Sequence, residues 1–443
     1  MKIRSLIVAT FVFLALAGTL YWSEHHKPAD EISKASANSA PAILKLNEAS
    51  ITQLELKPNG AKPIALKKSD SGSWQIVQPK PFAADQSAVS GVLSSLSSLN
   101  SERVVEDKAS DLKQFGLDHP AVEIDVTERD NKNHQLLIGD ATPAGGAVYA
   151  MLAGDPRVFT MASYSKTSID KSLNDLRDKR LLTVSPDKIS RLDLLAKNQE
   201  IEFGRSKDEW QILKPKPLLA NSTQVGELVG KLTDARMDLN GSEKDAADNA
   251  SAFAKAAPVA TAKVTSDSGT EELQVRKSKD TYYAKSSVVE GIYKVDSSLG
   301  QALDKKLDDF RNKSLFDFGY SDPSKIEMHS GSAAYFLTKG GADWWSNGKK
   351  MDSGSVESLI GDLRDLSASK FVDSGFASPT IDLTVTSPDA KRVEKVSIAK
   401  SGDGFVAKRE NDPTLYYLEP GPVDALQKAA GDLKPAAPSQ KQK

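Results

Sequence analysis

The 443-residue chain contains no cysteine. This absence excludes disulfide bonds, metal sites built from thiolates and cysteine nucleophiles. It also fits an oxidising compartment, where a stray thiol is a liability. Stability and function must therefore come from other side chains.

An excess of charge of either sign is also missing. The chain has 58 Lys and Arg against 60 Asp and Glu, a formal net charge of −2, and its basic residues are dispersed. Such a chain has no global field that would draw it to nucleic acid or to anionic lipid. We therefore expect no nucleic-acid partner.

Histidine is scarce, and the five histidines are His25, His26, His119, His134 and His329. No two of them are three or four residues apart, and no His-Glu-x-x-His motif occurs, so we expect no metal site. The pair His25-His26 is typical of a solvated linker, with incidental metal affinity as the alternative. His119 precedes proline and is interpreted as a turn residue rather than a catalytic base.

Motifs for a nucleophile or a phosphate site are missing as well. There is no Gly-x-Ser-x-Gly elbow and no glycine-rich loop ahead of a helix. The Ser-x-x-Lys spacing of penicillin-recognising enzymes recurs by chance, as at 163–166, 185–188 and 367–370, without the partner motifs. We expect no catalytic residue and no cofactor, and we predict that the protein is not an enzyme.

A single long apolar run is present, the 18 residues from Ser5 to Trp22, preceded by Lys2 and Arg4. Its length is near the minimum for crossing a hydrocarbon core of about 30 Å. We interpret 1–23 as an inner-membrane anchor (or uncleaved signal) that leaves the C-terminal body in the periplasm. The alternative is a cleaved signal peptide ending near Ala17. Residues 24–46, rich in Ala, Ser, Lys, Glu and Pro, resemble a flexible spacer.

An octamer returns at domain spacing and organises the rest of the chain. Residues 74–81 read Trp-Gln-Ile-Val-Gln-Pro-Lys-Pro and residues 210–217 read Trp-Gln-Ile-Leu-Lys-Pro-Lys-Pro, 136 residues later (210 − 74). A degraded third copy begins at Trp344-Trp345. An internal repeat of this period indicates a duplicated domain. We predict modules at 47–183, 184–317 and 318–434, followed by a disordered tail at 435–443.

Hydrophobic patterns within each module alternate as in strands or recur as in helices. In the first module they predict strands at 51–56, 63–66, 74–77, 122–126, 135–138, 147–151 and 157–161, a helix capped by Asp85 with Val89, Val92, Leu93, Leu96 and Leu99 facing inward, and a closing helix at 168–180. The second module repeats this order up to a closing segment at 307–313. The third begins at 325–328 and ends in a shorter helix at 422–433.

Large side chains recur ten residues apart at Tyr149 and Phe159, Tyr283 and Tyr293, and Val406 and Tyr416. We interpret each pair as a hairpin that brings two large side chains together on one face, for packing rather than ligand stacking. Trp74 and Trp210 are expected in the core. Because neighbouring strand residues face opposite sides, one of Trp344 and Trp345 is expected to be exposed or buried against another module.

Carboxylates cluster near the end of the first two modules, at Asp175 with Asp178 and at Asp308 with Asp309, beside Arg and Lys. They are typical of a solvated, salt-bridged helix face. Their recurrence suggests a shared structural role, such as fixing this helix to the next module's first strand.

The predicted fold class is α+β: three tandem modules, each an antiparallel or mixed sheet with helices packed on it, plus an N-terminal transmembrane helix. The residues that mark the repeat are Trp74, Pro79, Pro81, Gly116, Pro120, Tyr149, Arg177, Trp210, Pro215, Pro217, Tyr283, Arg311 and Trp345.

These motifs resemble the bacterial family known as domain of unknown function 4340. The resemblance rests on Trp74-Gln75-Ile76 with its prolines and on the segments 115–120, 138–143, 148–150 and 176–179. It covers 47–317 clearly and 318–434 weakly. It implies an anchored, extracytoplasmic protein, and some members are associated with ATP-binding-cassette transporters. The family has no established catalytic residues to carry over.

Two classes of function follow. The first is a non-enzymatic scaffold or accessory subunit, held at the membrane by its N-terminal helix and bound to an envelope or transporter protein. The alternative is an envelope glycan-binding protein or hydrolase, which would need an exposed cleft with clustered carboxylates or aromatics.

Overall fold

The protein structure, a computed structural model, describes residues 42–207, 209–239, 243–318 and 321–437. The anchor predicted for 1–23 lies outside these residues, as do most of the predicted spacer and tail. Among the described residues, no helix is both long and apolar enough to cross a membrane.

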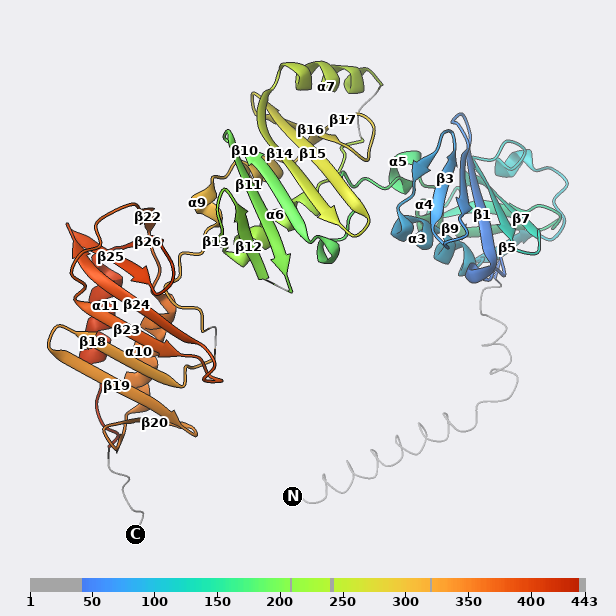
Figure 1. Cartoon of the computed structure of the whole chain (residues 1–443). Coiled ribbons are helices and arrows are strands. Elements are labelled where there is room, and N and C mark those ends of the chain that lie inside the picture. Colours follow the sequence, from blue (N-terminus) through green and yellow to red (C-terminus); the bar gives the residue numbers. More distant parts are fainter. Residues whose placement is uncertain (1–41, 208, 240–242, 319–320, 438–443) are drawn as a thin grey trace, which may run out of the picture. The chain divides into compact units, whose positions relative to one another are not determined.

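Three antiparallel β-sheets with packed helices make up the described chain (Figure 1), which confirms an α+β fold of three sheet modules. The chain divides into two compact units, Met1–Lys179 with the first sheet and Arg180–Lys443 with the other two. We call each sheet with its helices a module, numbered in chain order.

The elements of the first module follow the predicted order closely. They are η1(Glu48–Ser50), β1(Ile51–Pro58), β2(Ile64–Lys68), β3(Trp74–Gln78), β4(Phe82–Ala83), α3(Gln86–Ser97), β5(Arg103–Glu106), η2(Lys113–Phe115), β6(Val122–Glu128), β7(Asn133–Ala141), β8(Ala147–Leu152), β9(Val158–Ala162), α4(Ser163–Ile169) and α5(Leu173–Leu176).

The second module repeats this series, with an additional helix, α7, after the first long one. Its elements are η3(Pro186–Lys188), β10(Arg191–Ala196), β11(Gln199–Ser206), β12(Glu209–Lys214), β13(Leu218–Leu219), α6(Ser222–Thr233), α7(Glu243–Lys255), β14(Ala257–Ser266), β15(Gly269–Ser278), β16(Thr281–Ser286), β17(Ile292–Val295), α8(Ser297–Leu303) and α9(Leu307–Phe310).

The third module ends in one continuous helix. Its elements are β18(Lys325–Ser330), β19(Ala333–Gly340), β20(Asp343–Ser346), β21(Lys349–Lys350), α10(Ser353–Asp365), β22(Lys370–Val372), β23(Ile381–Thr386), β24(Val393–Ser401), β25(Gly404–Arg409), β26(Leu415–Leu418) and α11(Pro420–Gly431).

All three sheets share one topology. The first is ordered β4-β3-β2-β1-β6-β7-β8-β9-β5, the third β21-β20-β19-β18-β23-β24-β25-β26-β22, and the second matches them from β13 to β17. In each, a long helix joins two antiparallel meanders whose first strands pair at the centre, as β1 does with β6. Because all neighbours are antiparallel, hairpins make most connections.

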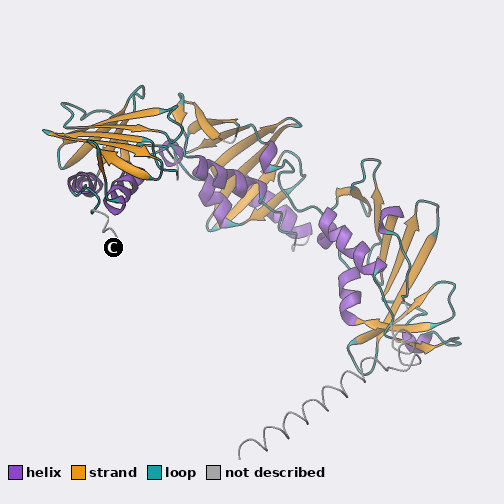
Figure 2. Cartoon of the chain, turned by 90° about the horizontal axis from the view of Figure 1, so that it is seen from below, coloured by secondary structure: helices purple, strands orange, loops and turns teal. Residues whose placement is uncertain are grey.

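Each long helix starts at a side-chain cap and buries one stripe. Asp85 accepts from the amides of Ser87 and Ala88, and Asn221 and Asp352 cap α6 and α10 in the same way. A side-chain acceptor at this position satisfies amides that have no partner inside the helix. Figure 2 shows α10 and α11 together on one side of the third sheet. The core of each module lies between the helices and this face of its sheet.

A short segment opens each module by pairing with the end of the long helix. The amides of Ile43, Leu181 and Leu315 donate to the carbonyls of Leu99, Ala235 and Leu366, at 2.9, 3.0 and 3.0 Å. Side chains of the three segments are buried in the corresponding cores. These segments lie a few residues before the expected module starts at 47, 184 and 318.

The predicted closing helix at 168–180 is wrong. Helix α4 ends at its C-cap, Asp170, and Ser172 caps a separate short helix, α5. The Ser172 side chain accepts from the amide of Asp175, and the Asp175 side chain accepts from the amide of Ser172, which is a capping box. After Leu176 the backbone is extended, and Arg177 forms a β-bridge with Ala84. The backbone therefore pairs with the edge of the sheet instead of continuing the helix.

The predicted pairing of Tyr149 with Phe159 is also wrong. In the β8–β9 ladder Phe159 lies opposite Ala150, and in the other modules Tyr293 and Tyr416 lie opposite Ala284 and Ala407. The residues that precede these alanines, Tyr149, Tyr283 and Val406, therefore point to the opposite face from Phe159, Tyr293 and Tyr416. A shift of one residue in register exchanges the two faces of a strand.

Candidate functional site

A cleft of about 560 Å³ opens at one end of the first sheet. Its apolar lining comes from Pro58, Ala61, Ile64, Pro79 and Leu173, and its polar lining from Lys62, Asp170, Lys171, Ser172 and Asp175. These residues belong to the β1–β2 turn, the segment after β3 and the junction of α4 with α5. The cleft combines an apolar lining with charges of both signs.

The β1–β2 hairpin opens because prolines interrupt its ladder. The register ends at Leu56 with Ile64. In the second module the corresponding hairpin pairs two steps further, up to Ala196 with Gln199. Pro58 and Pro63 have no amide hydrogen to donate, so the first hairpin cannot form the same pairs on both strands.

The opposite wall is the turn between α4 and α5. The Asp175 carboxylate accepts from the Ser172 amide at 3.0 Å and from its hydroxyl at 2.6 Å. The Ser172 hydroxyl bond is the main cause that holds the pKa of Asp175 below its usual value, so this side chain is anionic at neutral pH. Lys171 donates to the carbonyl of Thr167 at 2.9 Å.

The corresponding hairpins of the other modules are tied to the closing helices. In the second, Lys197 pairs with Asp304 at 3.3 Å, and Gln199 accepts from the amide of Leu307 at 3.1 Å. In the third, Gln427 donates to Ser330 at 2.9 Å. Lys62, at the tip of the first hairpin, makes no ion pair with any residue that the structure describes. The first module thus has a distinctive surface here.

The repeated tryptophans lie in the cores. Trp74 and Trp210 are each 7% exposed and Trp344 is 6% exposed. A cation lies 5.9 Å from each ring centroid, supplied by Lys68, Arg205 and Lys339 respectively. The third counterpart is therefore Trp344, and its assignment to Trp345 is corrected. Trp345 is 41% exposed, because successive strand residues alternate between faces.

The prolines of the octamer are exposed and follow the buried tryptophans at the end of the strand. The peptide bonds before Pro79 and Pro215 are cis. Pro81 and Pro217 precede the short edge strands β4 and β13.

Gly116 and Tyr149 lie at a second, smaller core on the other face of the first sheet, and Pro120 is half-buried in the loop that leads to β6. Phe115 packs edge-on against Tyr149 with 5.0 Å between ring centroids, beside the buried Leu117 and Val158. Gly116 has a φ of +66° and lies against Asp140. In the second module Tyr283 is buried.

Gly139 offers a test of this second core. A Cβ there would lie 2.2 Å from the carbonyl oxygen of Phe115, so Gly139→Ala should lower the free energy of unfolding by about 1–3 kcal/mol. The control is Gly91→Ala, inside α3 with no atom within 4 Å of the added carbon, which should be neutral or stabilising. Chemical denaturation of the full chain measures both. Equal transitions for the two variants would refute the close approach.

Arg177 and Arg311 end the closing segments and pair by β-bridges with Ala84 and Ala220. The Arg177 guanidinium lies 3.9 Å from the ring centroid of Phe82. Arg311 instead lies 3.4 Å from the ring centroid of Phe371, and it pairs with Asp308 at 3.0 Å. The equivalent carboxylates Asp175 and Asp309 cap their helices. Of the predicted salt-bridged face, Asp308 makes an ion pair while Asp175 and Asp309 act mainly as caps.

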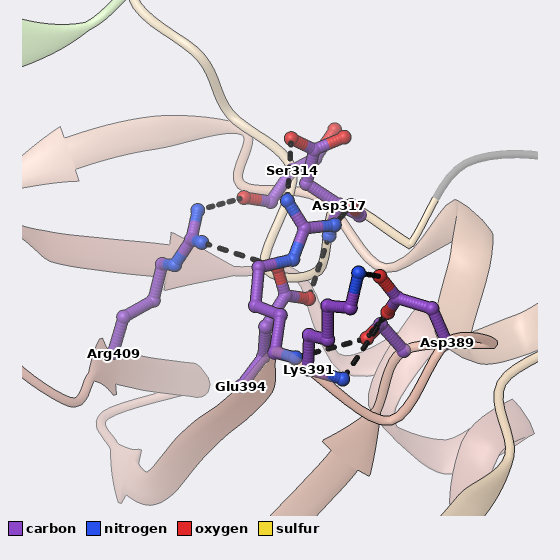
Figure 3. Close-up of polar contacts among 8 residues, drawn as sticks. Ser314, Asp317, Asp389, Lys391, Glu394 and Arg409 are labelled. Carbon is purple, nitrogen blue, oxygen red and sulfur yellow. Dashed lines mark hydrogen bonds and ion pairs between the residues drawn. The ribbon is translucent and has the colours of Figure 1, made fainter.

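A cluster around Glu394 fixes the segment that opens the third module (Figure 3). The Glu394 carboxylate accepts from the amide of Asp317 at 2.8 Å and pairs with Arg392 at 3.3 Å and Arg409 at 3.9 Å. Arg409 also donates to the carbonyl of Ser314 at 3.4 Å. The Glu394 side chain is 9% exposed, so water competes little for these contacts.

Glu271 makes the corresponding contact in the second module. Its carboxylate accepts from the Thr183 amide at 2.8 Å and from the Thr183 hydroxyl at 2.5 Å. Glu271 and Glu394 lie on the corresponding strands β15 and β24. Carboxylates thus do fix the joining segments, but they come from strands rather than from the closing helices.

Among the described histidines, His119 and His134 each lie beside a carboxylate side chain. His119 has an 87% exposed side chain beside Asp118, and His134 contacts Glu128 at 3.1 Å. The Glu128 carboxylate also accepts from Ser50 at 2.5 Å, and these two bonds lower its pKa. Throughout the described ranges, no group of three or more His, Asp or Glu residues could hold a metal ion.

The fold defines a class of protein: a tandem array of α+β modules, each an antiparallel sheet with helices on its core face. A family model described as Domain of unknown function (DUF4340) matches residues 74–217 and 210–380. Together these segments span more than half of the 443 residues, so the chain belongs to this family. No curated protein matches the chain.

The cleft is not evident from the sequence alone. Its sequence signal is Pro58 and Pro63 on either side of the Asn59-Gly60 turn, a pattern that the second module lacks. This proline pattern predicts only one wall of the cleft. The other wall is the turn between α4 and α5, and its position depends on where α4 ends and where α5 begins.

Proposed function

We propose that this protein is a non-enzymatic accessory or scaffold subunit of an ATP-binding-cassette transporter or of another envelope complex. In this proposal the N-terminal segment anchors it in the inner membrane and the modules stand in the periplasm. It acts by binding a protein partner through the first-module cleft and through further weaker contacts.

One observation carries this proposal: the features shared by the modules are internal, and the features that differ are exposed. The buried tryptophans, helix caps and opening and closing hydrogen bonds recur. By contrast, the cleft belongs to the first module and an exposed tryptophan to the third. Shared interiors with distinct surfaces suit several contacts made from one tether, which add through high effective concentration.

The test is recovery of partners after crosslinking in intact cells that express the full chain. Lys62→Trp places a large ring at the cleft and should lower recovery of the partner at least about tenfold. A loss of this size is typical when one central contact of a protein interface is disrupted. The control is Lys67→Trp, the same substitution on an exposed residue of β2 that does not line the cleft.

Equal recovery with both variants would refute the role of the cleft. Turnover of an envelope substrate by the purified protein, abolished by one substitution in a folded variant, would refute the non-enzymatic role altogether.

A further inference from the structure

Aromatic side chains form a strip on the face of the third sheet opposite its helices. Trp345 and Phe336 are each 41% exposed on the neighbouring strands β20 and β19. Phe336 packs against His329 of β18, with ring centroids 5.5 Å apart and an angle of 82° between the planes. We call these three residues the aromatic strip.

The strand register places the strip along one diagonal of the sheet. Trp345 lies opposite Thr338, and Phe336 is two residues from Thr338 on the same strand and the same face. On the other side, Phe336 lies opposite Glu327, which is two residues from His329. Diagonal neighbours on a sheet are about 7–8 Å apart, so one extended ligand can span the positions of all three side chains.

Gly340 shapes the strip. An added Cβ there would be 3.2 Å from both Cδ1 and Nε1 of Trp345, so the indole passes directly over the glycine. The absent side chain lets the ring rest on the backbone of the sheet while its outer surface remains open. Figure 2 shows the helices of this module on the other side of the strands.

The strip is specific to the third module. By register, Phe336 corresponds to Glu202 in the second module and to Ala65 in the first, and Trp345 corresponds to Gln211 and Gln75. The Glu202 carboxylate pairs with Arg191 and Lys214 at 2.9 and 2.8 Å. The same face is thus charged in one module and aromatic in another, while the core face is preserved.

Most charges around the strip are paired. Lys325 pairs with Glu327, and Lys350 pairs with Asp343 at 2.9 Å. Asp382, opposite His329, accepts from the Ser397 hydroxyl at 2.5 Å. The border therefore carries little net charge with which to attract a strongly charged partner. It offers hydroxyl and carboxylate groups close to the rings.

We infer that the aromatic strip binds an uncharged polysaccharide. The flat, apolar faces of sugar rings stack on exposed aromatic rings, and the hydroxyls at the ring edges bond to side chains such as Thr338 and Asp382. A row of rings, rather than one enclosed pocket, suits a chain of repeated units. This inference is independent of the accessory role and of the first-module cleft.

The test is a sedimentation assay with the purified full-length chain and two insoluble uncharged polysaccharides, chitin and cellulose. We expect the chain to sediment with at least one of them. The variants Trp345→Ala and Phe336→Ala should each weaken binding about tenfold, within the range for a ring stacked on an aromatic side chain. Trp345→Phe should restore part of the loss.

Val393→Ala is the matched control, because Val393 is also an exposed apolar residue on the same face, at 51% against 41% for Trp345. It lies four strands from Trp345, about 19 Å away by the spacing of strands, and its variant should bind like the original chain. Circular dichroism verifies that each variant is folded.

Four outcomes would overturn the inference. In the first three, the unaltered chain sediments with neither polysaccharide, or it binds equally well without Trp345 and Phe336, or it sediments only with beads that carry the anionic polymer heparin. Loss of a crosslinked protein partner in Trp345→Ala, without any polysaccharide binding, would likewise overturn it and assign the strip to a protein interface.

Discussion

Trp344→Ala should lower the free energy of unfolding of the third module by about 3–5 kcal/mol, and Trp345→Ala by less than about 1 kcal/mol. The two residues are adjacent and chemically identical, but Trp344 is 6% exposed and Trp345 is 41% exposed. Removing the buried indole leaves a cavity among residues such as Leu337 and Val356. Removing the exposed indole uncovers Gly340 and leaves the core intact.

Hydrogen exchange of the full-length chain, followed by mass spectrometry, locates the loss of stability. In Trp344→Ala, protection should fall in the strands and helices of the third module and be retained in the first. The neighbouring Trp345→Ala serves as the control for expression and handling. Equal losses in both variants would show that the alternation of faces at β20 is assigned incorrectly.

Glu394→Gln should destabilise the third module by about 1–3 kcal/mol, the range for leaving a buried polar partner without its bond. The carboxylate receives the Asp317 amide and lies beside Arg392 and Arg409, whose side chain is 14% exposed. The neutral amide keeps the shape of the side chain, but it removes the charge that balances the arginines. The opening segment at 314–317 should then detach more readily.

The control is Glu410→Gln, which breaks the pair with Lys395 at 3.0 Å. Both of those side chains are about half exposed, and exposed pairs contribute about 0–1 kcal/mol. Denaturant unfolding measures both variants, and hydrogen exchange at 314–317 reports the opening segment. If Glu394→Gln changes neither quantity more than the control does, the cluster does not hold the segment.

The sequence by itself determined the repeat, the fold class and most strands and helices. Interactions between residues close in sequence are sufficient for these features. An apolar residue at every second position indicates a strand with one buried face, and Asp85 ahead of an apolar stripe indicates the start of a helix. Because the octamer recurs, each module also supported the interpretation of the others. The burial of Trp74 and Trp210 was expected because tryptophan belongs to a core more often than to a binding surface.

Tertiary structure alone decided the features that depend on distant partners. Ten-residue spacing indicates a hairpin but leaves its register open by one residue, so Tyr149 was placed on the wrong face. The end of α4 depends on the extended pairing of Arg177 with Ala84, about 90 residues earlier in the chain (177 − 84 = 93). Hydrophobic periodicity carries no information about a backbone pair at that distance.

The surfaces with functional interest belong to this second group. The cleft requires an interrupted hairpin, a turn after β3 and a helix junction to meet, although each is unremarkable in sequence. The aromatic strip requires a register that places Trp345 over Gly340 and Phe336 beside His329. A sequence pattern specifies which face a residue occupies, whereas the packing of strands decides which residues share that face as neighbours.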